Sequence, residues 1–171
     1  MNWKSIAGIA GASLLTFVVM LWVIGFRPSA GHVEASVEID RIYLQVWPWI
    51  VQPDRQKQWI AGLVEVRQAG PMRLTWILRD GGNQVEIQSE VTEQDPPFKW
   101  IRRIHTPGRF SGISQYHVVE LAEGRTKVEL IEDYKYDSWF TRLLEPLSTP
   151  RAKEKWQENL ERLKRKVESG S

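Results

Sequence analysis

The sequence predicts an α+β fold in which a curved, seven-stranded antiparallel sheet wraps around a long C-terminal helix. After one early strand, turn residues such as Gly-Pro and Gly-Gly-Asn divide residues 61–138 into about six segments of strand length. From residue 152 onward, apolar residues recur at steps of four and three, which is the spacing of an amphipathic helix. A twisted sheet and a helix in this order bury their apolar faces together when the sheet curves around the helix.

The first predicted element is a transmembrane helix over residues 5–26, which follows a short tail, residues 1–4. Ser5–Phe26 is an uncharged run of 22 residues. As a helix it would be roughly 33 Å long at ~1.5 Å per residue, which matches a hydrocarbon core about 30 Å thick. Trp3 and Trp22 lie near its ends, as interfacial aromatics do. We therefore expect a single-pass membrane protein.

A cleaved signal peptide is the competing interpretation of this segment. The apolar region of a signal peptide is normally about 7–15 residues long and ends in an A-x-A-like site. The P-S-A-G-H sequence at residues 28–32 lacks that site. Lys4 precedes the span but Arg27 and Arg41 follow it, so the charges only weakly favour an inside N-terminus and an exported domain. Small residues spaced four apart within Ala7–Ala12 would permit weak dimerisation of the helix, although this spacing also arises by chance.

The soluble domain is predicted to span residues 33–171, after a Pro/Gly/Ser linker at residues 27–32. Its first segment, Val33–Ile39, alternates apolar residues with residues that include Glu34 and Glu38. This period of two is typical of a half-buried strand.

Two short helices are predicted to follow this strand and to close one end of the sheet. Asp40 is expected to cap the first helix, which runs through Val51. The second begins at Pro53 and ends near Trp59, and Pro48 and Pro53 are expected to bend the chain into the two helices.

The long C-terminal helix is expected to begin after Pro146 and Pro150. Its apolar stripe comprises Ala152, Trp156, Leu160, Leu163 and Val167.

Alternation along two strands predicts which side chains face the interior. The inward set of the last strand is Val128, Leu130, Glu132, Tyr134 and Tyr136. The inward set of the segment from residue 98 to 104 is Phe98, Trp100, Arg102 and Ile104. Each set therefore places one charged residue among apolar neighbours.

The domain resembles the START-like or SRPBCC superfamily of helix-grip proteins, which includes polyketide cyclase-like, coenzyme Q-binding and lipid-transfer members. The resemblance runs from about Val33 to Val167. It is carried by V-E-A-S-V-E-I-D, V-W-P-W-I-V-Q-P-D-R-Q-K-Q-W-I, G-R-T-K-V-E-L-I-E-D-Y-K-Y and W-F-T-R-L-L-E-P-L. It implies a helix-grip fold with an elongated apolar cavity between sheet and helix, where a hydrophobic small molecule or lipid would bind. The N-terminal span departs from relatives that are soluble.

Arg102 and Glu132 are the candidate polar residues of this cavity, on strands two positions apart. Tyr116, on the strand between them, could join the pair. One interpretation is a site for the carboxylate or carbonyl group of a ligand, or an acid of raised pKa for enolisation. The alternative is a structural salt bridge, kept because the loss of one partner would leave the other uncompensated.

Composition excludes several other functions. Without Lys4 and Arg27, 21 basic residues face 21 acidic ones, so the domain is formally neutral and lacks the basic surface that nucleic acid requires. There is no cysteine for disulfides or thiolate catalysis, and the three histidines show no metal-ligand spacing. We expect no metal, no cofactor and no nucleic-acid partner.

The nine tryptophans favour burial over a binding motif, although some could contact a ligand. The candidate ligand-binding residues are Trp59, Trp76, Trp100, Arg102, Tyr116, Glu132 and Tyr134.

Three functions remain open at this point. The leading hypothesis is a membrane-anchored domain that binds a hydrophobic ligand. The second is a cyclase- or dehydratase-like enzyme with Glu132 or His117 as general base. The third is a protein-interaction module with a filled cavity, which a cavity packed shut by Trp76, Trp100 and Tyr134 would favour.

Overall fold

A computed structural model describes residue 16, residues 18–20 and residues 30–170 of the chain. The predicted membrane span, its small-residue spacing and linker residues 27–29 lie almost entirely outside these residues. In the part that is described, no helix is both long and apolar enough to cross a membrane.

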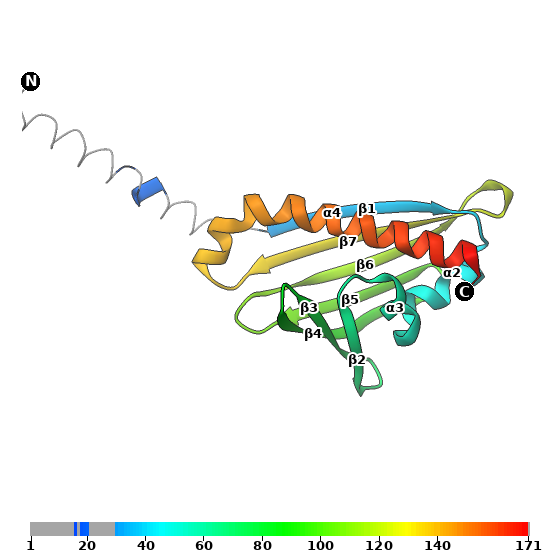
Figure 1. The fold of residues 1–171 in the computed structure, drawn as a ribbon, viewed down its shortest axis with the longest axis horizontal. Coiled ribbons are helices and arrows are strands. Elements are labelled where there is room, and N and C mark those ends of the chain that lie inside the picture. The colour runs from blue at the N-terminus through cyan, green and yellow to red at the C-terminus, as the bar shows by residue number, and fades with distance from the viewer. Residues whose placement is uncertain (1–15, 17, 21–29, 171) are drawn as a thin grey trace, which may run out of the picture.

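Seven antiparallel strands form one sheet, as the sequence predicted, and their order is β1-β7-β6-β5-β4-β3-β2. Figure 1 shows the sheet curving beneath α4, with α2 and α3 at the end opposite the start of β1. The strands are β1 (Ala30–Ile39), β2 (Leu63–Gly70), β3 (Arg73–Asp80), β4 (Asn83–Asp95), β5 (Lys99–Thr106), β6 (Phe110–Glu120) and β7 (Thr126–Tyr136).

β1 begins at Ala30, three residues before the predicted start at Val33. Ala30 pairs with Lys135 of β7, and His32 pairs with Asp133. The His32 Nδ1 atom also lies 2.7 Å from the Asp133 carboxylate. Residues 30–32 therefore belong to the sheet and not to the linker. Pairing with a distant strand extends β1 here, and the local alternation of residues 33–39 gave no sign of it.

The two short helices are α2 (Tyr43–Val51) and α3 (Pro53–Trp59). The predicted cap at Asp40 is wrong: the N-cap residue is Ile42 and no side chain caps it. The Asp40 backbone N–H instead donates to Glu168 of α4 at 2.9 Å. Pro48 lies inside α2 and does not divide the helices. The break comes at Gln52, because Pro53 disfavours helical geometry in the residue that precedes it.

α4 (Trp139–Ser169) is longer than predicted, because Pro146 and Pro150 lie inside it. Ser138 caps the helix by accepting a hydrogen bond from the Thr141 N–H at 3.1 Å. Proline removes a backbone donor and bends a helix without always ending it. Figure 1 shows α4 changing direction within its first turns and then running straight along the sheet. The sequence from Trp139 to Leu147, expected before the helix, is its bent beginning.

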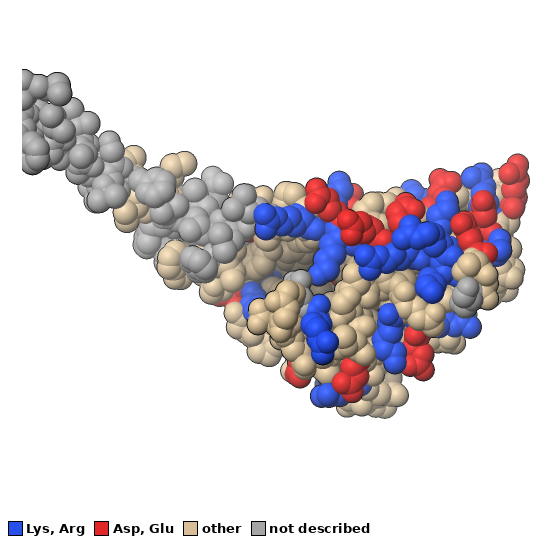
Figure 2. Space-filling model, viewed as in Figure 1, with Lys and Arg blue, Asp and Glu red and all other residues tan. Residues whose placement is uncertain are grey.

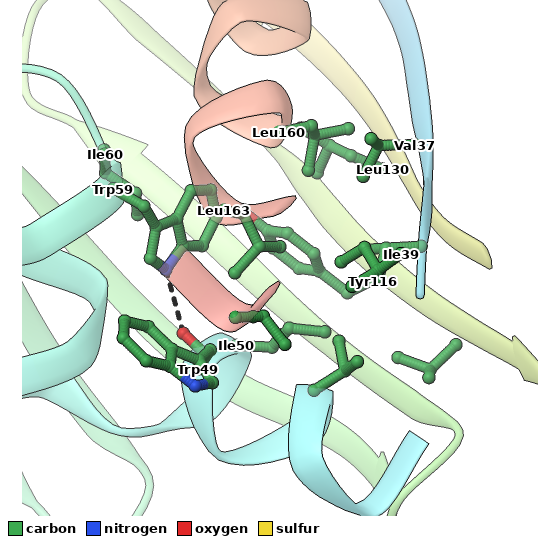
Figure 3. Packing of buried hydrophobic residues seen from close by; sticks show 14 of the residues in the cluster. Val37, Ile39, Trp49, Ile50, Trp59, Ile60, Tyr116, Leu130, Leu160 and Leu163 are labelled. Atoms are coloured by element: carbon green, nitrogen blue, oxygen red, sulfur yellow. Dashed lines mark hydrogen bonds between the residues drawn. The ribbon is translucent and has the colours of Figure 1, made fainter. Parts of the chain in front are cut away.

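The hydrophobic core lies under the C-terminal half of α4. Leu160 and Leu163 are fully buried between the sheet and the two short helices. Figure 3 shows Leu163 close to Tyr116 and Leu160 close to Leu130 and Val37. It also shows Trp59 beside Trp49, whose carbonyl oxygen accepts a 2.9 Å hydrogen bond from Trp59 Nε1. This bond joins α3 to α2 and satisfies the buried indole N–H. The tightly packed half of the domain is therefore the end distant from Ala30.

The outward face of α4 is charged. Figure 2 shows Lys and Arg side chains along this face, with Asp and Glu among them. Lys164 and Glu168, four residues apart on α4, lie 3.8 Å from each other. Such mixed charges are typical of a solvated helix face.

Candidate functional site

A cavity of about 260 Å³ lies between the inner face of the sheet and the middle of α4, from Ser148 to Asn159. Its wall is mostly apolar, and the apolar and aromatic lining residues are Ile60, Ala61, Trp76, Leu78, Ile87, Ile104, Phe110, Tyr134, Tyr136, Ala152 and Trp156. The polar lining residues are Arg102, Glu132, Ser148, Lys155 and Asn159. An apolar cavity with a few polar groups is the usual form of a small-molecule site.

Four of the seven residues predicted from sequence line this cavity: Trp76, Arg102, Glu132 and Tyr134. Trp100 and Tyr116 do not line it but pack around the Arg102 guanidinium. Trp59 lies elsewhere: it is the last residue of α3, is 1% exposed in the core and does not line this cavity. His117 alternates with the buried Tyr116 along β6 and lies on the other face of the strand.

Arg102 projects inward from β5, as its parity predicted, and is 2% exposed. Its guanidinium carbon lies 4.2 Å from the Trp76 ring centroid and 4.3 Å from that of Trp100. Such contacts compensate part of the cost of burying a cation. Burial lowers the pKa of Arg102, while the nearby Tyr116 and Glu132 oppose that shift.

Glu132 projects inward from β7 and is 7% exposed. Its Oε2 atom accepts a 2.8 Å hydrogen bond from Trp156 Nε1 of α4. Burial raises the pKa of Glu132, and the nearby Arg102, Ser114 and Trp156 groups reduce that rise. Glu132 therefore binds its proton more tightly than an exposed glutamate does.

Arg102 and Glu132 do not form the direct salt bridge that was one of the two interpretations of the pair, for no ion pair joins them among the described residues. Arg102 Nη2 instead donates to Ser114 Oγ at 3.2 Å. Ser114 lies on β6, opposite Arg102 on one side and Glu132 on the other. Its side chain also hydrogen-bonds to Glu132 and lowers that residue's pKa. A serine of the intervening strand thus separates the two charges, which residue parity alone did not indicate.

Tyr134 forms the wall of the cavity near the start of β1. Its neighbours across the sheet are Gly31 on β1 and Gly112 on β6. A Cβ atom at Gly31 would overlap the Tyr134 ring, so this glycine leaves room for it. At Gly112 a Cβ atom would overlap the Asp133 carbonyl oxygen and the Cα and Cβ atoms of Tyr134. The ring packs against Phe110 at 6.0 Å and Tyr136 at 5.5 Å between centroids.

Two contacts, one near each end of the cavity, hold α4 over it. The hydroxyls of Tyr136 and Ser148 lie 2.9 Å apart. At the other end, Asn159 Oδ1 accepts a hydrogen bond from the Ala61 N–H at 2.9 Å.

Sequence reasoning missed several residues of this site, among them Phe110, Ser148 and Asn159. Trp156 was recognised only as part of the apolar stripe of the helix. Gly112 could have been found, because an isolated glycine within a strand often marks a close approach of another group. The described residues contain no group of three or more His, Asp or Glu side chains that could hold a metal ion.

The sheet, the long helix and the cavity between them define a helix-grip domain of the ligand-binding type. Residues 30–168 match the family model described as "Polyketide cyclase / dehydrase and lipid transport". The chain belongs to this family. The match covers the described domain from the first residue of β1 almost to the end of α4.

Solved structures share the fold at low sequence identity. A conserved protein from Geobacillus kaustophilus has a TM-score of 0.73 and 14% identity, with 81% of this chain and 96% of the other covered. A START superfamily protein from Mycobacterium smegmatis has a TM-score of 0.68 and 13% identity, covering 82% and 99%. The Zhui aromatase/cyclase from Streptomyces sp. R1128 has a TM-score of 0.66 and 14% identity, covering 82% and 94%. No curated protein matched the chain.

Proposed function

We propose that this protein is a membrane-anchored binding protein that holds a hydrophobic small molecule or lipid in the cavity beneath α4. The observation that carries the proposal is the cavity itself, about 260 Å³ with a mostly apolar wall. A volume of this size exceeds many times the roughly 30 Å³ that one water molecule occupies. Binding is favourable when an apolar ligand displaces water from such a space, because apolar surface is then removed from contact with water.

The uncharged run Ser5–Phe26 supports the membrane anchor. Because β1 begins at Ala30, only residues 27–29 separate the domain from that run. The four steps from Phe26 to Ala30 span at most about 14 Å when fully extended. An anchored domain would therefore be held close to the bilayer surface.

The position of the cavity fits such an arrangement. Ala30 pairs with Lys135, which lies between the cavity residues Tyr134 and Tyr136. The cavity is thus in the half of the domain where β1 begins. A ligand taken from the bilayer would have a short path to it, and tethering would raise the local supply of that ligand without added affinity.

Binding is favoured over catalysis by the surroundings of Glu132. An enzyme of the cyclase or dehydratase kind needs an acid and a base that face the same substrate. Glu132 faces the cavity but is already bonded to Trp156, and His117 lies on the other face of the sheet. An interaction module with a filled cavity is disfavoured because Trp76, Trp100 and Tyr134 leave the cavity open.

Native mass spectrometry of the full chain, extracted in a mild detergent, tests ligand binding. We expect a bound organic compound of low mass that is lost in the variant Ala152→Trp, because Ala152 lines the cavity from α4 and a larger side chain would fill it. Lys153→Trp, at an exposed position of the same helix, is the control and should retain the compound. A wild-type chain that always appears without a bound compound would contradict the proposal.

A further inference from the structure

The cavity contains a buried cation whose charge and hydrogen-bond donors are only partly compensated. A guanidinium has five N–H donors. Arg102 Nη2 donates to Ser114 Oγ, and the buried Nε atom has no hydrogen-bond partner among the described residues. Such unpaired donors cost free energy in an apolar interior.

No carboxylate in the described part of the chain forms an ion pair with Arg102. The nearest acidic candidate, Glu132, is engaged by Trp156 at Oε2 and has a pKa raised by burial. The hydroxyl of Tyr116, which packs on Arg102 from β6, is also buried and without a partner among the described residues. Arg102 therefore has more hydrogen-bond donors than the neighbouring protein groups accept.

Aromatic side chains hold the Arg102 guanidinium in place. The Trp76 and Trp100 rings contact it from β3 and β5, and the Tyr116 centroid lies 5.5 Å from its central carbon. These contacts leave the N–H groups, which point outward in the guanidinium plane, as the part able to bind a ligand. Planar acids such as carboxylates match this geometry with two parallel hydrogen bonds.

We propose that the ligand is a compact amphipathic acid, whose carboxylate or similar anionic group binds Arg102 while its apolar body fills the cavity under α4. This inference rests on the proposed ligand cavity and specifies the chemistry of what enters it. The anion supplies an acceptor to the part of the guanidinium that reaches the cavity and neutralises the buried charge. The surrounding wall, from Ile104 to Tyr134 and Trp156, accommodates rings or a single chain.

Calorimetric titration of the full-length chain with two matched probes tests the inference. The probes are 2-naphthoate and 2-naphthamide, which share the same ring body and nearly the same shape but differ in charge. We expect 2-naphthoate to bind about tenfold or more tightly than 2-naphthamide, because hydrogen bonds to charged groups are the stronger ones. Titrations into detergent without protein correct for partitioning.

Two variants locate the charge preference. Arg102→Met removes the buried cation and should abolish the preference for the acid while the amide still binds. Arg103→Met removes the same charge from the neighbouring position on β5, where Arg103 is exposed and lies 3.7 Å from Glu90. This control should retain the preference for 2-naphthoate.

The outcomes separate this inference from the proposed function. Equal binding of both probes to the wild-type chain would overturn the acid but leave the apolar cavity intact. An acid preference that survives Arg102→Met would overturn the role of Arg102. Binding of neither probe would overturn both proposals. The wild-type comparison decides the acid preference even if Arg102→Met does not fold.

Discussion

The indole of Trp156 and the carboxylate of Glu132 join α4 to β7 across the cavity through a hydrogen bond of 2.8 Å. This bond connects the long helix to the sheet beside the space that a ligand would occupy. Because both residues line the cavity, the contact sets the local separation of helix and sheet. Its removal should affect both stability and ligand binding.

The variant Trp156→Phe should destabilise the domain by about 1–3 kcal/mol, because Glu132 then loses a donor while it stays buried. Urea unfolding followed by circular dichroism measures the change. A double-mutant cycle with Glu132→Gln supplies the control: the cost of Trp156→Phe should be smaller when Glu132→Gln is already present. Equal costs in both backgrounds would show that the hydrogen bond does not couple the two residues.

The stability of the domain should depend on the protonation of Glu132. Burial raises its folded pKa above the ordinary glutamate value of 4.5. The folded state therefore binds this proton more tightly than the unfolded state does. The resulting stabilisation is complete below pH 4.5 and is lost as the pH rises through the folded pKa.

Glu132→Gln should remove this contribution, so its free energy of unfolding relative to wild type should increase as the pH is raised from about 4 toward about 8. Denaturant titrations at several pH values measure the difference. The matched control is Glu129→Gln, on the outer face of the same strand, where Glu129 pairs with Lys127 at 2.7 Å. An unchanged difference between Glu132→Gln and wild type over the whole range would contradict the assigned pKa shift.

The two glycines beside Tyr134 should respond differently to rescue. Gly31→Ala and Gly112→Ala should each cost about 1–3 kcal/mol through overpacking. The added Cβ at residue 31 would meet the Tyr134 ring, whereas at residue 112 it would meet the Asp133 carbonyl oxygen and the Cα and Cβ atoms of Tyr134, which Tyr134→Leu retains. Thermal unfolding should therefore show that Tyr134→Leu largely rescues Gly31→Ala but not Gly112→Ala. Equal rescue would mean that the ring alone limits both positions.

The proposed membrane anchor predicts that the full chain remains with membranes after alkaline extraction. Leu14→Arg combined with Leu15→Arg should release it, since each arginine near the centre of a span costs roughly 2.5–3.5 kcal/mol. Leu44→Arg, at a 59% exposed position of the domain, is the control and should stay bound. If the intact mass of the purified protein instead corresponds to a chain that starts near residue 30, the segment is a cleaved signal peptide.

The positions of the strands along the chain were largely predictable, because they follow from local alternation and turn chemistry. The parity of β7 and β5 placed Glu132 and Arg102 inside, and both are buried. Phe98 shows where the rule ends: it precedes β5 and is 43% exposed, stacked against Tyr43 of α2 with 5.3 Å between ring centroids. Beyond the end of a strand, parity no longer determines the direction of a side chain.

By itself, the sequence determined the α+β class, the six strands that follow the two short helices, and the inward position of Arg102 and Glu132. These features follow from periods of two and of about 3.6 residues, which are properties of the local chain. Only the tertiary structure decided that β1 extends back to Ala30 and that α4 continues through Pro146 and Pro150. It also decided that Arg102 donates a hydrogen bond to Ser114 and that Glu132 accepts one from Trp156. Those outcomes depend on packing against partners up to about a hundred residues away. This packing overrides the local preferences of the chain, and no single segment of the sequence reveals it.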